Sequence, residues 1–252
     1  MEQYMEVIKT LMDQFYNKNI ILVGNSVEML NYEHGKFIDS HDVIIRMGRG
    51  IPNPDGLEDN MKAIGTRTDV WCTGFLRENM IKMPHIKTVP IILLNRTRMY
   101  MKTPREPYYL KDFYTMFTDN QILDIYDEFK FVDTRSRKNT ITESVKADLL
   151  GMKNKTVPNY GRPSNGFITL LWLIRKANNW KSLTLIGFDF FAKYFPVNVG
   201  RAKPQSWHLP HNKHHETPHR GDIEREYALE LKQKGLINWI ILSDLKEEVL
   251  EF

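Results

Sequence analysis

The sequence of 252 residues predicts a single α/β domain, an open and mostly parallel sheet flanked by helices. Short apolar runs rich in β-branched residues alternate along the chain with helical patterns, which is typical of buried parallel strands. Several of these runs end in a glycine, a common feature of the turns that follow strands in nucleotide-binding sheets. The composition, 42% hydrophobic and 26% charged, is that of a globular protein with a sizeable core.

Six apolar runs are the predicted strands, and each is bounded by polar or turn-forming residues. They cover residues 20–23, 42–48, 67–74, 88–95, 183–187 and 238–245. No composition shift marks a domain boundary, so residues 1–252 are predicted to form one domain.

The clearest predicted helix follows Ser164, whose side chain is placed to cap it. Apolar residues then recur at helical spacing to Ala177. The first 19 residues read as an amphipathic helix, because acidic side chains interrupt the apolar ones as they would not in a signal peptide or membrane anchor. Further helices are expected at residues 111–117, 119–129, 143–150 and 223–234, and a loop at 192–220.

A basic region at about residues 76–140 is predicted to be an insertion that forms a lid over the acceptor. Its segment from Arg77 to Arg105 holds seven basic residues and one acidic residue, a net charge of +6. Two interpretations stand side by side, a solvated surface and a face for an anionic partner, either nucleic acid or a charged glycan.

Cys72 is the only cysteine, so the chain cannot form an internal disulfide. This suits a reducing compartment, and no apolar run is long enough to cross a bilayer. We therefore expect a cytoplasmic protein without a membrane span, in a bacterium or an infected host cell.

The first candidate site is the turn Gly24-Asn25-Ser26, which follows the strand at 20–23. Such a turn can present backbone N–H groups to an anion, although by itself it is more often structural. It matches neither G-x-G-x-x-G nor G-x-x-x-x-G-K-[ST], which disfavours a dehydrogenase and a P-loop enzyme.

The second candidate site is Ser164-Asn165-Gly166, at the start of the clearest helix. Free N–H groups, a hydroxyl and the positive helix end suit a phosphate there. The alternative is that Ser164 is an N-cap and nothing more.

The third candidate site is the histidine-rich stretch that ends in His219, followed by Glu224. Histidine is the usual general base near neutral pH, and Glu224 could orient it or cap the next helix. Alternatives are a solvated loop, or a metal site that uses His211 with His214, or His215 with His219. The chain contains no D-x-D and no H-E-x-x-H, so we expect no metal and no cofactor.

Together these segments resemble the sialylmotifs of glycosyltransferase family 29, the sialyltransferases. The large motif resembles V-G-N-S, I-D-S-H-D and the apolar run to Arg46, and a G-T-x-T segment follows at Gly65–Thr68. The small motif resembles P-S-x-G at Pro163–Gly166 and the later Ile186-Gly187-Phe188. The very small motif, H-x-x-x-x-E, fits His219 and Glu224.

The resemblance implies a sialyltransferase fold, a variant of GT-A, and an inverting transfer from a CMP-sugar without a metal. It implies that His219 is the base and that His215 or His214 stabilises the departing phosphate. The implied donor-binding residues are Gly24, Asn25, Ser26, Arg46, Thr66, Ser164, Asn165 and Gly166. The chain departs from the family at Gly48, where an asparagine usually touches the nucleotide, and its single cysteine cannot form the disulfide of the Golgi enzymes. We also expect it to lack their membrane anchor.

Three functions remain open from the sequence. The first is transfer from a CMP-sugar to a glycan or small acceptor. The second is transfer of a pentose or hexose from a UDP-sugar to hydroxymethylcytosine in bacteriophage DNA, suggested by the basic stretch and its tyrosines. The third is a non-catalytic nucleotide-binding module, which the presence of His219 disfavours.

Overall fold

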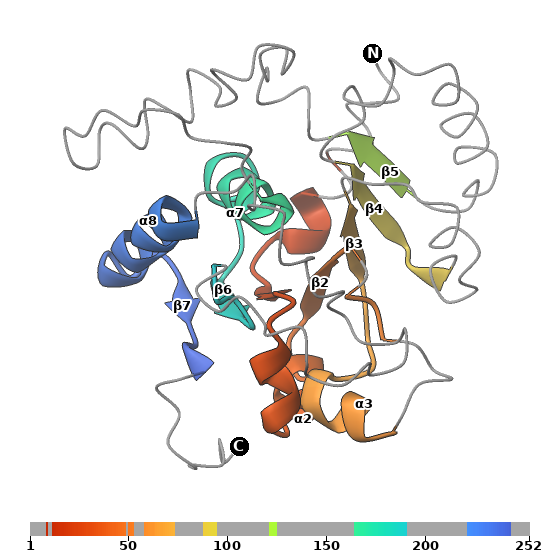
Figure 1. The fold of residues 1–252 in the computed structure, drawn as a ribbon. Coiled ribbons are helices and arrows are strands. Elements are labelled where there is room, and N and C mark those ends of the chain that lie inside the picture. Colours follow the sequence, from red (N-terminus) through yellow and green to blue (C-terminus); the bar gives the residue numbers. More distant parts are fainter. Residues whose placement is uncertain are drawn as a thin grey trace, which may run out of the picture.

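The computed structural model describes residues 9, 12–48, 50–52, 58–73, 88–94, 121–124, 164–190 and 221–242. Within them, seven parallel strands form one sheet in the order β5-β4-β3-β2-β1-β6-β7 (Figure 1). The strands are β1 (Asn19–Val23), β2 (Val43–Met47), β3 (Val70–Thr73), β4 (Ile91–Leu94), β5 (Gln121–Asp124), β6 (Ser182–Ile186) and β7 (Asn238–Trp239). The predicted open, parallel α/β sheet is confirmed.

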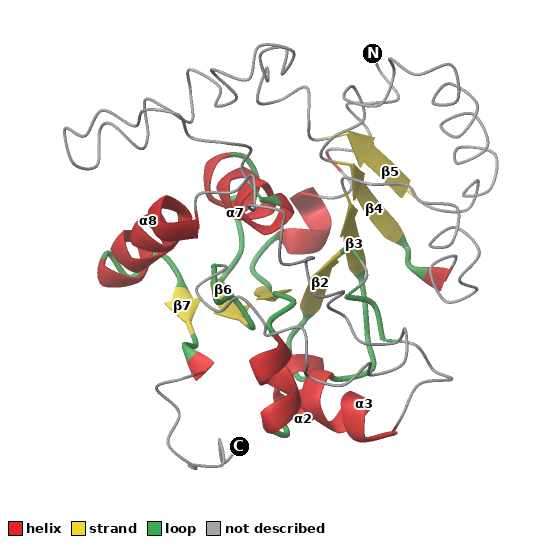
Figure 2. Ribbon diagram, in the orientation of Figure 1, coloured by secondary structure: helices red, strands yellow, loops and turns green. Residues whose placement is uncertain are grey.

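Helices cover both faces of this sheet. On one face lie η1 (Val27–Asn31), α2 (Gly35–Asp39) and α3 (Glu58–Ile64), and on the other lie α7 (Asn165–Arg175) and α8 (Gly221–Gln233) (Figure 1). Figure 2 shows the same layers by type of secondary structure. Coverage on both faces explains why the strands are continuous apolar runs and do not alternate with polar residues.

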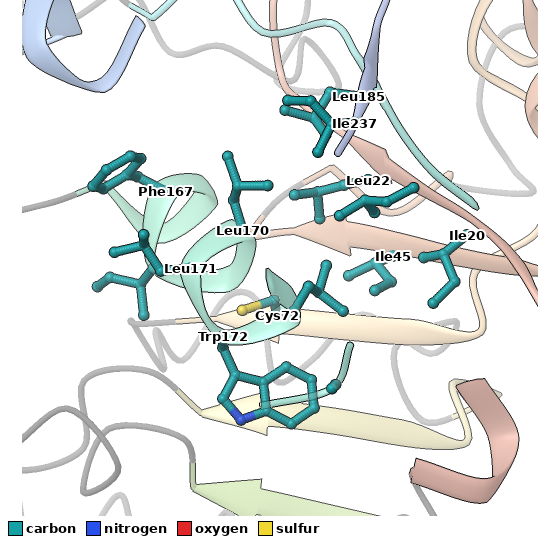
Figure 3. Close-up of a cluster of buried hydrophobic side chains, with 14 of the residues drawn as sticks. Ile20, Leu22, Ile45, Cys72, Phe167, Leu170, Leu171, Trp172, Leu185 and Ile237 are labelled. Carbon is teal, nitrogen blue, oxygen red and sulfur yellow. The ribbon is translucent and has the colours of Figure 1, made fainter. Parts of the chain in front are cut away.

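The core divides between the two faces at the central strand β1. Ile20 and Leu22 pack with α7 and α8, whereas Ile21 and Val23 pack with α2 and α3. Figure 3 shows side chains of α7 against Ile20, Leu22 and Ile45. Because successive side chains of a strand point to opposite faces, one apolar run builds both halves of the core.

Helix α7 begins and ends close to its predicted limits. The Ser164 side chain accepts the Phe167 N–H, so Ser164 is its N-cap. Residues 166–173 are all buried, which places this helix within the core. At its far end, Trp172 meets Phe15 edge to face, with ring centroids 6.1 Å apart.

One prediction about the basic region is wrong. Residues 119–129 were predicted to be helical, but 121–124 form β5, so that prediction is wrong there. The apolar pair Ile122-Leu123 pairs in register with Ile92-Leu93 of β4, and pairing with the sheet outweighs a weak local helical pattern. Both β4 and β5 come from the segment predicted as an insertion or lid, so part of that segment belongs to the sheet.

Other expectations fall outside the described residues. They are the helices at 111–117 and 143–150, the loop at 192–220 and most of the basic region. The last strand, expected over eight residues, is described over only two, Asn238–Trp239. In the part of the chain that the structure describes, no helix has the length and apolarity that a membrane crossing needs.

Candidate functional site

The strand order reverses beside β1, which lies between β2 and β6. At such a point the loops that leave two neighbouring strands diverge, and α/β proteins bind ligands in the crevice between them. Here these loops follow the carboxyl ends of β1 and β6, and the end of β2 lies next to them.

Two glycines let the loops after β1 and β6 meet backbone to backbone. Gly24 N–H donates to the Ile186 carbonyl at 2.7 Å, and Ser26 N–H donates to the Gly187 carbonyl at 2.9 Å. A Cβ on Gly24 would lie 2.1 Å from the Gly187 oxygen, and Gly187 itself has a φ of +72°. Neither position accepts a side chain without moving the backbone, so Gly24 shapes the site by its size.

Asn25 carries the polar side chain of this turn. Its Nδ2 donates to the Met47 carbonyl at 3.2 Å, which joins the turn to the end of β2. Its Oδ1 is buried and has no hydrogen-bond partner among the described residues. A buried acceptor of this kind suits a ligand that brings a hydroxyl or amino group. Ser26, in contrast, is buried and caps η1 by accepting the Glu28 N–H.

The first turn of α7 lies at the same edge of the sheet. A Cβ on Gly166 would come within 2.6 Å of the Phe188 ring and 3.0 Å of the Met47 Sδ. Met47 therefore contacts both the Asn25 turn and the start of α7. The structure brings Gly24, Asn25 and Ser26 together with Ser164, Asn165 and Gly166. We call Asn25, Ser164, Asn165 and Gly166 the carboxyl-edge cradle.

Glu224 of α8 binds Ser164 at the start of α7. Its carboxylate accepts the Ser164 N–H at 2.7 Å and the Ser164 hydroxyl at 2.6 Å, and its side chain is fully buried. The hydroxyl proton therefore goes to Glu224 and not to a ligand in this arrangement. The N-cap interpretation of Ser164 is confirmed, whereas its contact with a donor stays a prediction.

The sequence predicts that Glu224 orients His219 or caps the next helix, and this stays a prediction. The described partner of Glu224 is Ser164. The spacing of 60 residues between them provides no local signal of this pairing. Only the shared topology, two helices that begin at the same edge of the sheet, brings them together.

Thr66 lies at the opposite edge, before β3 begins. Its N–H and hydroxyl both donate to the Asp39 carboxylate, with the hydroxyl at 2.9 Å, and the Arg67 N–H joins them at 3.2 Å. Asp39 precedes β2, so these groups gather at the amino ends of the strands. The structure does not bring Thr66 to the cradle, and the G-T-x-T segment binds the I-D-S-H-D segment.

Arg46 is fully buried, and its guanidinium binds the backbone next to Thr66. It donates to the carbonyls of Ile64, at 2.6 Å, and Arg67, at 2.8 Å. Burial lowers the pKa of Arg46 to about 10, against the opposing charges of Asp39 and Asp69, so it stays cationic at neutral pH. We call Asp39, Arg46, Thr66 and Arg67 the amino-edge latch. The predicted donor contact of Arg46 would require this enclosure to open.

Gly48 occupies the position where the resembled family has asparagine. Its φ is +55°, a conformation that glycine and asparagine adopt more readily than other residues. Its carbonyl accepts the Trp71 indole N–H at 2.7 Å. No described atom lies within 4 Å of a Cβ built on it, so the backbone here is already suited to an asparagine.

The three predicted catalytic histidines, His214, His215 and His219, lie outside the described residues, as does His211 of the alternative metal site. Their roles stay predictions. The chain connection is nevertheless short, since His219 is two residues before Gly221, the first residue of α8.

An open parallel sheet whose strand order reverses at β1 is the architecture of the nucleotide-binding α/β proteins. The sequence profile described as glycosyltransferase family 29 (sialyltransferase) matches residues 12–236. The chain therefore belongs to this family and is a glycosyltransferase that uses a nucleotide-sugar.

Two solved structures are similar to the chain. One is a mammalian sialyltransferase, with 17% identity and a TM-score of 0.51, covering 93% of this chain and 78% of the other. Another is a mammalian sialyltransferase in complex with Gal-beta-1-3GalNAc-ortho-nitrophenol, with 16% identity, a TM-score of 0.49 and coverage of 92% and 78%. The first shows that the fold is shared. Among curated proteins, none matches the chain significantly.

Proposed function

We propose that the protein is an inverting transferase that moves a sugar from a CMP-sugar to an acceptor hydroxyl without a metal. The observation that supports this most is the meeting of the Asn25 turn with the first turn of α7 at the switch point of the sheet. One is a polar turn with a buried acceptor and the other is a helix amino terminus, and a nucleotide presents the complementary hydroxyl and phosphate groups.

The donor binds along the carboxyl-edge cradle in this proposal. The amino terminus of α7 carries a partial positive charge, which favours the phosphate of the donor. The buried Oδ1 of Asn25 accepts a hydrogen bond from the ribose or the base. Ser164 contributes by fixing the start of α7 through Glu224, since its own hydroxyl proton is already donated.

His219 is the proposed general base. It takes the proton of the acceptor hydroxyl, and the oxygen attacks the anomeric carbon on the face opposite the phosphate. The bond from that carbon to the phosphate oxygen breaks, the phosphate leaves with the electron pair, and the configuration inverts. His215 or His214, together with the amino terminus of α7, stabilises the negative charge that develops on the phosphate.

A thermal-shift panel of CMP, UDP, GDP and ADP tests the donor. A nucleotide that binds only the folded protein stabilises it and so raises its Tm. At a concentration of 100 times Kd, the free energy of unfolding rises by about 2.7 kcal/mol. We expect CMP to give the largest shift, with no need for a divalent cation. A Tm that none of the four nucleotides raises contradicts the proposal. A Tm shift that appears only with added divalent cation contradicts the proposal that the enzyme needs no metal.

Replacement of the base tests the mechanism. His219→Ala should lower kcat roughly 10²–10⁴-fold, because a positioned general base contributes that much. His208→Ala is the matched control, since it removes a histidine of the same polar stretch to which no role is assigned. Near-full activity of His219→Ala would show that another group is the base.

The alternative acceptor is DNA, favoured by the net charge of +6 between Arg77 and Arg105. A UDP response in the panel, together with binding of duplex DNA that weakens steeply with salt, would move the assignment to a DNA-modifying transferase. A CMP response without duplex binding leaves a glycan or small acceptor.

A further inference from the structure

A second hydrogen-bonded connection, separate from that of Glu224, reaches the first turn of α7. Thr169 lies one turn into the helix and is fully buried. Its Oγ1 donates to the Asn165 carbonyl at 2.8 Å, and the Cys72 Sγ lies 2.7 Å from the same hydroxyl. Cys72 belongs to β3, and Figure 3 shows its sulfur directed toward α7.

The direction of these bonds follows from the groups involved. A carbonyl only accepts, so the Thr169 hydroxyl proton is given to Asn165. The thiol of Cys72 is then the donor to Thr169. A chain of hydrogen bonds runs from β3 through Thr169 to the backbone of Asn165, which belongs to the carboxyl-edge cradle.

The first turn of a helix frays because its N–H groups lack partners within the helix. Asn165 contributes a carbonyl and not such an N–H group, and the Thr169 hydroxyl connects that carbonyl to Cys72 of β3. Here the first turn of α7 is held from two sides, by Glu224 at Ser164 and by Cys72 through Thr169. A turn held in the bound arrangement does not have to be ordered when the ligand arrives, which favours tight binding.

We propose that Thr169 is a positioning residue for donor binding. It holds the amino-terminal turn of α7 at the carboxyl end of β3, where Asn165 and Gly166 meet the nucleotide phosphate. This inference rests on the proposed binding of a CMP-sugar at the cradle.

Thr169→Val tests it, because valine keeps the shape and removes the hydroxyl. We expect the Kd for CMP to rise about 3- to 10-fold, the usual effect of one hydrogen bond. The KM for the donor should rise in parallel while kcat stays within about twofold, since the reacting groups are untouched. Thr169→Ser restores the hydroxyl and should bind CMP nearly as the unchanged protein does.

The matched control is Thr184→Val on β6. Thr184 is also a buried threonine whose hydroxyl has one side-chain partner, His41 Nε2 at 3.4 Å. Its replacement should lower the Tm without changing the Kd for CMP, so it separates a loss of stability from a loss of positioning.

Cys72→Ala and Cys72→Ser form a second pair that decides the matter if Thr169→Val does not fold. Serine keeps a donor for Thr169 and alanine removes it, so only alanine should weaken CMP binding. An unchanged Kd in Thr169→Val or Cys72→Ala overturns the positioning role alone. Failure of the unchanged protein to bind CMP overturns the proposed function and this inference with it.

Discussion

The two edges of the sheet differ in the groups that hold them together. At the amino edge, the latch collects charged and polar groups that hydrogen-bond one another, although Arg46 Nη1 is buried without a partner among the described residues. Arg67 donates there to the carbonyls of Asp39 and His41 and to the Asp69 carboxylate. At the carboxyl edge, glycines let backbones approach closely, and Asn25 keeps a buried oxygen with no partner among the described residues.

The difference teaches which motif residues hold the frame and which serve the ligand. Buried polar groups that are fully bonded stabilise a fold, whereas an unsatisfied one lowers stability unless a ligand completes it. We therefore expect changes in the latch to alter stability and leave turnover per folded molecule unchanged. Changes in the cradle should do the reverse.

Arg46→Met should have the largest effect on stability. It leaves the Ile64 and Arg67 carbonyls without their buried donor, and each buried acceptor left unsatisfied costs about 1–3 kcal/mol. Urea denaturation measures this loss. Arg46→Lys keeps the charge but not the planar guanidinium. Its free energy of unfolding should lie between those of the unchanged protein and Arg46→Met. A variant of unchanged stability that cannot bind CMP would return Arg46 to the donor site.

Asp39→Asn should have the next largest effect. Its carboxylate accepts from Thr66 and Arg67, and the loss of charged hydrogen bonds costs about 1.5–3 kcal/mol. Asp13→Asn, on the exposed side of the first helical segment, is the control and should change the free energy of unfolding by less than about 0.5 kcal/mol.

Asp39→Asn also tests whether the G-T-x-T segment takes part in donor binding. Asp39→Asn should leave the Kd for CMP unchanged in the folded fraction, because Thr66 lies at the amino edge. A much weaker Kd there would connect the latch to the donor and remove the contrast between the two edges.

The fold and the position of half of the candidate site could be predicted because they depend on local signals. Apolar runs predict β1, β2, β3, β4 and β6, and Ser164 with the apolar spacing that follows it predicts α7. The turn at Asn25 was predicted as a site because a strand followed by a glycine turn is itself a local pattern.

Thr66 and Arg46 could not be placed from the sequence, because a motif does not tell which edge of the sheet it occupies. The segment from Gly65 to Asp69 leads into β3, so it had to lie at the amino edge once the strand limits were known. The partner of Glu224 was equally hidden, since it depends on how two helices far apart in the chain begin at one edge.

Asn25→Ala tests the cradle. Loss of the Oδ1 acceptor should weaken CMP binding about tenfold, which corresponds to the loss of one to two hydrogen bonds. The stability of the free protein should change little, since the only described bond lost is the 3.2 Å contact with Met47.

Asn179→Ala is its counterpart near the amino edge. Asn179 likewise donates through Nδ2 to a carbonyl, that of Met12 at 2.9 Å, and its Oδ1 is likewise buried without a described partner. It should leave the Kd for CMP unchanged. Equal effects of the two asparagines on CMP binding would mean that Asn25 acts through the fold and not through the ligand.

Acid should destabilise the protein slightly, through His34 and His41. Both are buried, and burial lowers the pKa of each below 6.5; for His41, the carbonyls of Phe37 and Ile38 and the charge of Asp42 oppose the shift. As the pH falls, the unfolded chain takes up these protons first. Stability is therefore full above pH 6.5 and declines as the pH drops toward the lower folded pKa values, by no more than about 1.4 kcal/mol per pH unit for each histidine.

Urea unfolding at pH 8, 7, 6 and 5.5 measures this decline, and the double variant His34→Gln, His41→Gln isolates the share of these two residues from that of the other histidines. The variant should have a shallower slope than the unchanged protein. The effect of the double variant should appear in stability, because the His41 ring Nε2 lies 3.4 Å from the Thr184 hydroxyl and the His41 carbonyl accepts from Arg67 of the latch. An identical dependence of the free energy of unfolding on pH in the two proteins would contradict the prediction. It would mean that the buried histidines are protonated as readily in the folded protein as in the unfolded chain.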